Sequence, residues 1–237
     1  MSFKNVSMSN NPKVTIILSV FNNEKTIAKS LESLVLQTYE NTEIFVLDDA
    51  STDNTLEIIT SKYSNNSKIR IIRNTVNLGL TKSLNKLINM SSSNFIARHD
   101  GDDISHPERI EVQMLEMQSK NLDFVSSRAE STDGKKIYPG MSFYLPYKYL
   151  LKYKNPFIHG TLLIRREIIK NVNLYDEDYI YAQDYKLMCD LLLTKAKYKV
   201  IKKPLYKLNM ENNISTNFTL EQKKYANMAQ KQYKKSL

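Results

Sequence analysis

The chain has 237 residues and a net charge of +9, with 41% hydrophobic and 25% charged residues, a composition typical of one large globular domain or two small ones. A single cysteine excludes an internal disulfide framework, and no apolar run approaches the roughly 18 residues that a membrane span needs. Residues 1–11 are rich in Ser and Asn and lack the apolar core of a signal peptide, so we expect a flexible tail and a cytoplasmic protein.

Strands and helices alternate along the first part of the chain. The apolar run 14–20 predicts a buried strand, because β-branched residues dominate it. Three strand–helix alternations within about ninety residues are typical of a parallel, Rossmann-like sheet. The further strands are predicted at 43–47, 68–73 and 94–99, and the helices at 26–39, 55–63 and 80–90.

The pattern becomes irregular after residue 131. Just before it, Ser105 is a candidate N-cap of a helix with Pro107 in its first turn. The other predicted elements are strands at 123–128 and 161–164, a helix at 185–193 and a basic helix from 220 onward. We expect four segments: the tail 1–11, two halves of one domain at 12–130 and 131–216, and a basic C-terminal helix at 217–237.

Three carboxylates, Asp100, Asp102 and Asp103, follow the predicted strand 94–99. In an open α/β sheet, ligands bind at the carboxyl ends of the strands. Carboxylates this close raise one another's pKa unless a cation neutralises them, and oxygen ligands suit Mg²⁺ or Mn²⁺, which also hold substrate phosphates. The alternative interpretation is an acidic surface turn that begins the next helix.

A second acidic pair, Asp48 and Asp49, follows the predicted strand 43–47. A carboxylate there can accept hydrogen bonds from a base or a ribose hydroxyl. Turn and capping chemistry is the alternative, and it is our interpretation of Asp53. Gly79 stands alone and no glycine-rich phosphate loop is present, so a bound nucleotide would need metal to neutralise its phosphates. This favours a nucleotide–sugar or pyrophosphate substrate over NAD.

Two residues of the second half are candidates for chemistry. Asp184 precedes the predicted helix 185–193, where it is either an acid favoured by the helix dipole or a general base for a sugar hydroxyl. His159 follows a loop that contains Pro156 and is either structural, a metal ligand or a phosphate donor.

Taken in order, these motifs resemble the family-2 glycosyltransferases of the GT-A fold, over about residues 13–216. Asp100-Gly101-Asp102 resembles the metal-binding DXD motif of that family. The resemblance implies an α/β GT-A fold with a mixed central sheet, in which a Rossmann-like nucleotide-sugar-binding half, 12–130, joins a smaller acceptor-side region, 131–216. The matching stretches are 17–24, 33–38, 47–55, 77–80 with Asn85, 97–103 with 107–109, 155–161 and 183–187.

The same resemblance implies a role for each candidate. Asp184 is the expected catalytic base, and Asp102, Asp103 and His159 are the expected ligands of Mn²⁺ or Mg²⁺. Gln183 departs from the pattern, because many relatives carry Glu there, and Ser19 to Phe21 departs where relatives often have Pro or Tyr. The expected donor-binding residues are Val20, Phe21, Asn22, Glu24, Asp48, Asp49 (on the base), Asn77, Gly79, Arg98 and Asp100 (on the ribose).

The implied reaction is inverting, metal-dependent transfer of a sugar from a nucleoside-diphosphate sugar, expected to be UDP-linked, to a hydroxyl of a glycan or lipid-linked acceptor in cell-surface polysaccharide synthesis. A metal-dependent nucleotidyltransferase and a catalytically silent binding protein of this fold are the alternatives. Nucleic acid is not an expected partner, since no nucleic-acid-binding module is present. The lysine-rich C-terminal half fits either a solvated surface or peripheral contact with an anionic membrane at its inner face.

Overall fold

The computed structural model describes residues 11–209 and 219–237. Apart from Asn11, the expected N-terminal tail lies outside these ranges, as does the expected boundary at 216/217. The strands are β1 (Val14–Val20), β2 (Thr42–Asp48), β3 (Ile69–Arg73), β4 (Phe95–Arg98), β5 (Ile104–Ser105), β6 (Phe124–Ser131), β7 (Ile137–Tyr138), β8 (Leu163–Arg165) and β9 (Tyr198–Leu208). The helices are α1 (Ile27–Val35), α2 (Thr55–Tyr63), α3 (Leu80–Met90), α4 (Arg109–Ser119), α5 (Tyr147–Leu150), α6 (Arg166–Asn171), α7 (Gln183–Leu193) and α9 (Thr219–Lys235), with 3₁₀ helices at Met141–Tyr144 and His159–Thr161.

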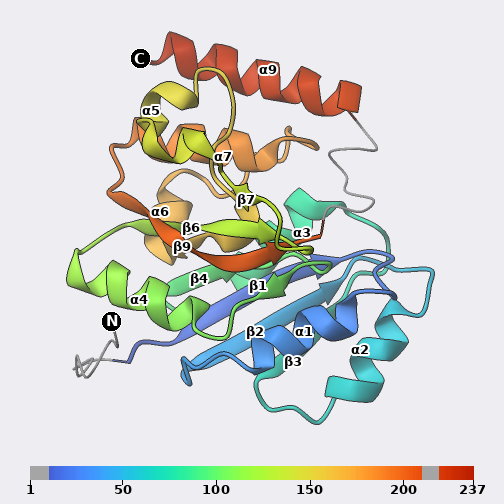
Figure 1. Ribbon diagram of the computed structural model, residues 1–237. Helices are drawn as coiled ribbons and strands as arrows, with labels where there is room; N and C mark the ends of the chain where they lie inside the picture. The colour runs from blue at the N-terminus through green and yellow to red at the C-terminus, as the bar shows by residue number, and fades with distance from the viewer. Residues whose placement is uncertain (1–10, 210–218) are drawn as a thin grey trace.

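One nine-stranded sheet runs through both expected halves of the domain (Figure 1). Its order is β3-β2-β1-β4-β8-β6-β9-β5, and β7 pairs with β6. The strands β1 to β4 are parallel, whereas β8 runs antiparallel to both β4 and β6. The sequence-based expectation of an α/β fold with a mixed central sheet is therefore confirmed.

The core lies on both faces of this sheet, because successive strand residues point to opposite faces. In β8, Leu163 packs into the cluster that contains α1, α2 and α4 side chains, among them Leu31. The next residue, Ile164, packs into the cluster that contains α3, α6, α7 and α9 side chains, among them Tyr233. Each face thus has its own layer of helices, and β8 contributes to both.

The expectation that Ser105 caps a helix is wrong. Ser105 lies in β5, opposite Tyr206 of β9, and α4 begins only at Arg109. Side chains of the α1 region hold the segment in place: Ser33 Oγ accepts the Ser105 N–H at 3.0 Å, and Gln37 Nε2 donates to the Ser105 hydroxyl at 3.2 Å. These long-range contacts outweigh the local preference of serine for a helix start.

Strand β9 was not expected, because its sequence reads as a lysine-rich solvated stretch. It pairs with β6 on one side and with β5 on the other. Proline lacks the N–H that a ladder needs, but Pro204 lies where the register with β6 shifts beside Arg128, so the ladder is already interrupted there. Within the two described ranges, no helix is long and apolar enough to cross a membrane.

We expect Leu163→Ala to lower the free energy of unfolding by about 3–5 kcal/mol, because the side chain is fully buried where the two halves of the sheet meet. Urea unfolding followed by circular dichroism measures this loss, and a single transition is expected. Leu36→Ala, at a side chain that is 61% exposed, is the control and should change stability by less than about 0.5 kcal/mol. Separate transitions for 12–130 and 131–216 would contradict one continuous core.

Candidate functional site

A cavity of about 370 Å³ lies beyond the carboxyl ends of β1, β2 and β4. These ends meet because the three strands are parallel neighbours, and this is the edge where ligands bind in α/β sheets. Segments far apart in the sequence therefore come together as the sequence predicted. The lining residues are Ser19 to Asn23, Asp49, Asn77, Gly79, Leu80 and Asp100 to Asp102.

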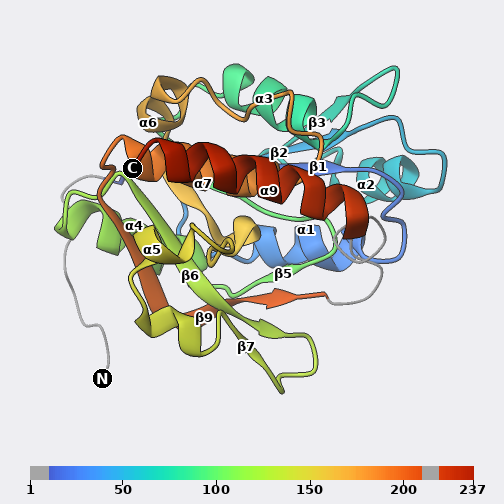
Figure 2. The same cartoon turned by 90° about the horizontal axis from the view of Figure 1, so that it is seen from above.

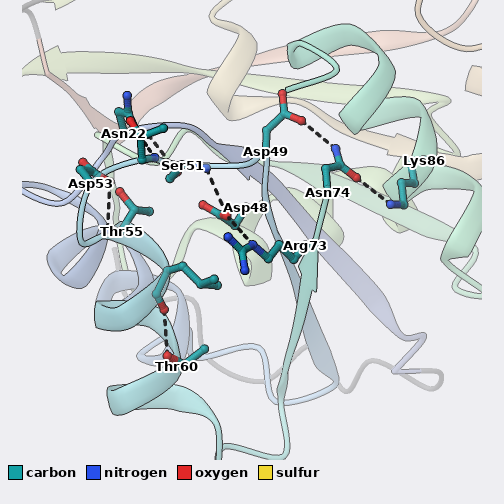
Figure 3. A network of polar contacts seen from close by, with 12 residues as sticks. Asn22, Asp48, Asp49, Ser51, Asp53, Thr55, Thr60, Arg73, Asn74 and Lys86 are labelled. Atoms are coloured by element: carbon teal, nitrogen blue, oxygen red, sulfur yellow. Dashed lines mark hydrogen bonds and ion pairs between the residues drawn. The ribbon is translucent and has the colours of Figure 1, made fainter. Parts of the chain in front are cut away.

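Asp49 fixes the wall of this cavity that leads into α3. Its carboxylate accepts the N–H groups of Leu78 at 3.0 Å and Gly79 at 2.8 Å, and the side-chain amide of Asn74 at 2.7 Å. Figure 3 shows Asp49 pointing toward Asn74, which in turn contacts Lys86. One oxygen, Oδ2, accepts a single hydrogen bond from the described residues, so a lone pair remains there for a further hydrogen bond.

Asp48 and Glu24 do not line the cavity, although we expected both among the donor-binding residues. Asp48 is fully buried, and its Oδ2 accepts the Ser51 N–H at 3.3 Å and lies 3.9 Å from Arg73 Nε (Figure 3). Glu24 accepts the N–H of Asn54 at 3.2 Å at the start of α2. Both carboxylates brace the loop after β2 in place of facing the cavity.

The loops after β1 and β2 are joined to each other. Asn22 has a positive φ of 54° and lines the cavity; its N–H donates to Ser51 Oγ at 3.0 Å, and its Oδ1 accepts the Thr52 N–H at 2.9 Å. Asp53 accepts the Thr55 N–H at 2.9 Å, which agrees with its interpretation as a capping residue. The exposed ring of Phe21 and the side chain of Asn22 are therefore presented at the cavity from a braced loop.

Asp100 is oriented by groups from three elements. Its Oδ1 lies 2.5 Å from a terminal nitrogen of Arg98, which is almost wholly buried and does not line the cavity. Its N–H donates to the Tyr206 hydroxyl of β9 at 3.0 Å. The backbone at Gly160 passes very close to Asp100 and Tyr206. A Cβ at this position would lie 2.8 Å from Asp100 Oδ2 and would overlap the Tyr206 hydroxyl. A glycine is therefore required at this point.

Asp102 and Asp103 form a crowded acidic pair beside Asp100. Burial and repulsion from Asp100 raise the pKa of Asp102 to about 6. The pKa of Asp103 rises to about 8 for the same reasons, with repulsion from Asp102 added, although Asp103 Oδ1 accepts the N–H of Asn209 at 2.7 Å. A cation would relieve this repulsion.

These carboxylates suit a cation that binds together with its substrate. Over residues 11–209 and 219–237, no three His, Cys, Asp or Glu side chains gather into a metal cage. His159, an expected third ligand, instead has its Nε2 2.8 Å from the Tyr175 hydroxyl. Mg²⁺-like ions are usually held by one or two carboxylates and complete their coordination with phosphates and water, and Asp102, which lines the cavity, fits that pattern. Asp103 is buried beside it and is not among the lining residues.

The second half of the chain adds a separate group around Asp184. This residue lies in the first turn of α7, and its Oδ2 accepts the side-chain amide of Asn155 at 2.8 Å. Burial, assisted by Arg98, lowers the pKa of His159 to about 4, while Asp100 and Asp184 act in the opposite direction. His159 therefore lies within electrostatic reach of both acids and is neutral at pH 7.

Sequence reasoning missed several residues of this site. Tyr206 is hydrogen-bonded to both Asp100 and Asp103, and Tyr175 contacts His159. Arg109 is fully buried, and its guanidinium lies 5.3 Å from the centroid of the Tyr206 ring. Neither tyrosine belongs to a short motif, and Arg109 lies in the matching stretch 107–109 but was not singled out as a site residue. The only available signal was the alternation of apolar residues and lysines in β9.

We expect Asp103→Asn to remove a pH-dependent loss of stability. The folded protein keeps protons on Asp102 and Asp103 that the unfolded chain releases near pH 4, so stability falls as the pH rises through the window from about 4 to 8. Asparagine can still accept the Asn209 N–H, so the variant should melt at a higher temperature than wild type at pH 8 without divalent cations, and this difference should shrink as the pH is lowered toward 4. Equal melting temperatures at pH 8 would contradict the crowded-acid description.

Comparison with known proteins agrees with this architecture. The family described as "Glycosyl transferase family 2" matches residues 15–172. The chain is 34% identical over 175 residues to the "Putative glycosyltransferase EpsE" of Bacillus subtilis, covering 71% of this chain but only 62% of that protein. It is 31% identical over 182 residues to "UDP-Glc:alpha-D-GlcNAc-diphosphoundecaprenol beta-1,3-glucosyltransferase WfgD" of Escherichia coli, covering 76% of this chain and 69% of WfgD.

Solved structures show the same fold at low identity. TarS 1–349 of S. aureus in complex with UDP-GlcNAc has a TM-score of 0.74 at 22% identity, covering 87% of this chain and 61% of that one. Mannosyltransferase PcManGT from Pyrobaculum calidifontis, in complex with GDP-Man and Mn2+, has a TM-score of 0.73 at 16% identity, covering 92% and 62%. With the family match extending over most of the sheet and the cavity, the chain belongs to glycosyl transferase family 2 and has its GT-A fold.

Proposed function

We propose that this chain transfers a sugar, with inversion, from a nucleoside-diphosphate sugar to a hydroxyl of a glycan or lipid-linked acceptor in cell-surface polysaccharide synthesis. The observation that carries the proposal is the shared cavity of Asp49, the Asn77 to Leu80 loop and the Asp100 to Asp102 loop. A base-binding wall and an acidic diphosphate-binding wall then face one another in one cavity. The chain spans only 62% of EpsE and 61% of the TarS fragment, so this proposal concerns the part of the protein in hand.

The donor would bind with its base between Phe21 and Asp49. The ring of Phe21 offers a partly exposed stacking surface, and Asp49 Oδ2 keeps a lone pair for a base N–H. Asp100, oriented by Arg98 and Tyr206, can accept a ribose hydroxyl. In this proposal the diphosphate would lie toward Asp102 and the sugar toward the second half of the chain.

Mn²⁺ or Mg²⁺ would be held by Asp102, with Asp103 beside it, and when bound would stabilise the charge of the leaving nucleoside diphosphate. The raised pKa values of both carboxyls support this, because burial and repulsion between the acids disfavour their charged forms and a cation would offset both effects. His159 is left outside this set by its bond to Tyr175. We assign it a position near the diphosphate as a neutral hydrogen-bonding group.

Asp184 is the proposed general base. The amide of Asn155 holds one of its oxygens at 2.8 Å, which leaves the other oxygen to accept the proton of the attacking acceptor hydroxyl. A carboxylate that deprotonates the acceptor on the side opposite the leaving group gives a product of inverted anomeric configuration. No acid on the donor side is needed, because the nucleoside diphosphate leaves as an anion.

UDP is the proposed nucleotide, and a lipid-linked diphosphate glycan is the proposed acceptor class. WfgD, as its name states, takes a UDP-linked donor and a diphosphoundecaprenol acceptor, and the TarS complex contains UDP-GlcNAc. PcManGT, with GDP-Man, shows that the fold also holds another nucleotide.

We expect Asp184→Asn to lower kcat by about 10²–10⁴-fold and to leave the affinity for the nucleotide donor unchanged, because asparagine cannot take the acceptor proton. Steady-state kinetics with a radiolabelled UDP-sugar and calorimetric titration with UDP measure the two quantities. Wild-type kcat in this variant would remove Asp184 from the mechanism while leaving the donor site intact.

We expect Asn155→Ala to lower kcat by about 10–100-fold with the donor KM unchanged, since it removes one hydrogen bond to a charged group that must be held in place. Asn65→Ala, at an exposed residue between α2 and β3, is the matched control. The same kcat in both variants would mean that Asn155 does not position the base.

A further inference from the structure

The described surface carries a cluster of exposed apolar side chains between β7 and Asn155. Met141, Tyr144, Leu145, Tyr149 and Tyr153 are each between 53% and 83% exposed. Within the single turn of α5 and the residues after it, Tyr147 and Leu151 point into the core while Tyr149 and Tyr153 face outward. Exposed apolar patches of this kind mark interaction surfaces.

The charge of this cluster is uniformly positive. From residue 134 to residue 166 the sequence contains no aspartate or glutamate. Lys148 and Lys154 are exposed and Lys152 is half-buried, and across the part of the chain that the structure describes none of the three is ion-paired. The lysines are therefore available to an anionic partner.

Helix α9 extends this surface. Tyr233 donates its hydroxyl hydrogen to the Lys148 carbonyl at 3.2 Å, and Gln230 donates to the Tyr153 carbonyl at 2.8 Å. Lys234 Nζ lies 5.2 Å from the centroid of the Tyr153 ring. Figure 2, which looks down on α9, shows α5 beside its C-terminal end. We call residues 141–154 together with Lys231, Lys234 and Lys235 the Tyr–Lys surface.

The chemistry of this surface favours a lipid membrane over the other partners. Protein interfaces are depleted in lysine, and an acidic glycan would gain nothing from Met141 and Leu145. At a membrane, by contrast, tyrosines and aliphatic side chains enter the headgroup region while lysine ammonium groups meet anionic lipids. Lys152 lies over the Tyr149 ring at 5.8 Å, so charge and apolar surface are presented together.

We propose that the Tyr–Lys surface binds peripherally to membranes that contain anionic phospholipids. The sequence alone suggested such contact for the C-terminal helix; the structure adds residues 141–154, which precede Asn155 and its bond to Asp184. The role of this surface in sugar transfer rests on the proposed function. Membrane binding would set the acceptor side of the site next to the bilayer, where the diphosphate of a lipid-linked acceptor would lie.

Flotation with lipid vesicles tests the proposal without any need for sugar transfer. The full chain should bind phosphatidylcholine vesicles that contain phosphatidylglycerol, and should be released by high salt. The triple variant Lys148→Gln, Lys152→Gln, Lys234→Gln should bind about 100-fold more weakly, at roughly a factor of five per lysine. A control with Lys62→Gln, Lys82→Gln and Lys202→Gln changes the same charge on α2, α3 and β9 and should bind like wild type.

A second variant tests the apolar part of the surface. Tyr149→Ser with Tyr153→Ser keeps every charge and should also weaken vesicle binding, while its melting temperature and UDP affinity stay those of wild type because both rings are exposed. The proposal would be overturned if the control triple variant lost vesicle binding to the same extent. It would also be overturned if the wild-type protein bound an acidic polysaccharide but no vesicles. Vesicle binding without any UDP binding would instead remove the proposed function and leave the membrane surface standing.

Discussion

The site depends on two buried arginines, Arg98 and Arg109, and on the ion pair that Arg98 makes with Asp100 at the end of β4. Arg98 and Arg109 are both almost wholly buried, and buried charges are stable only when they are paired and hydrogen-bonded. Arg98 pairs with Asp100, and Arg109 donates to the carbonyls of Arg98 and Gly160 at 2.9 and 2.6 Å. Burial lowers the pKa of Arg109 to about 10, so it is still charged at neutral pH.

This arrangement explains why one acid differs from the other two. Asp100 faces a guanidinium and is held in a defined orientation, whereas Asp102 and Asp103 have raised pKa values and no cationic partner at contact distance among the described residues. Arg98 therefore balances one carboxylate, and the other two carboxyl groups are left to a cation. The same interactions tie the first half of the chain to β9 through Tyr206.

The sequence predicted the first half of the fold well because its signals are local. Helices α2 and α3 have the predicted limits, and β1 to β4 are within two residues of them, since apolar periodicity and the acidic strand ends mark each element. The second half was harder because its structure depends on distant contacts. The preference of Ser105 for a helix start is outweighed by its contact with Ser33 of α1. The lysine-rich segment β9 forms a strand because it pairs with β6 and β5.

The residues of the candidate site likewise differ in how well the sequence predicted them. Asp49 and Asp100 follow predicted strands, so their position along the chain indicated them, whereas Asn77 and Gly79 were expected only from the family resemblance; all four line one cavity. The partners that orient them come from more distant segments and have no motif, and Tyr206 is the main example. We expected Asp48 and Asp49 to act together because they are adjacent in the sequence. At a strand end, however, successive side chains point in different directions, and the two carboxylates have different partners (Figure 3).

The central claim is that one cavity holds a nucleoside diphosphate against Asp102. Calorimetric titration of the protein with UDP, GDP and dTDP, each with and without Mn²⁺, tests it most directly. The account predicts Mn²⁺-dependent binding of UDP that is lost in Asp102→Ala while circular dichroism shows that the variant is folded. Absence of binding for all three nucleotides, or undiminished Mn²⁺-dependent binding in Asp102→Ala, would contradict it.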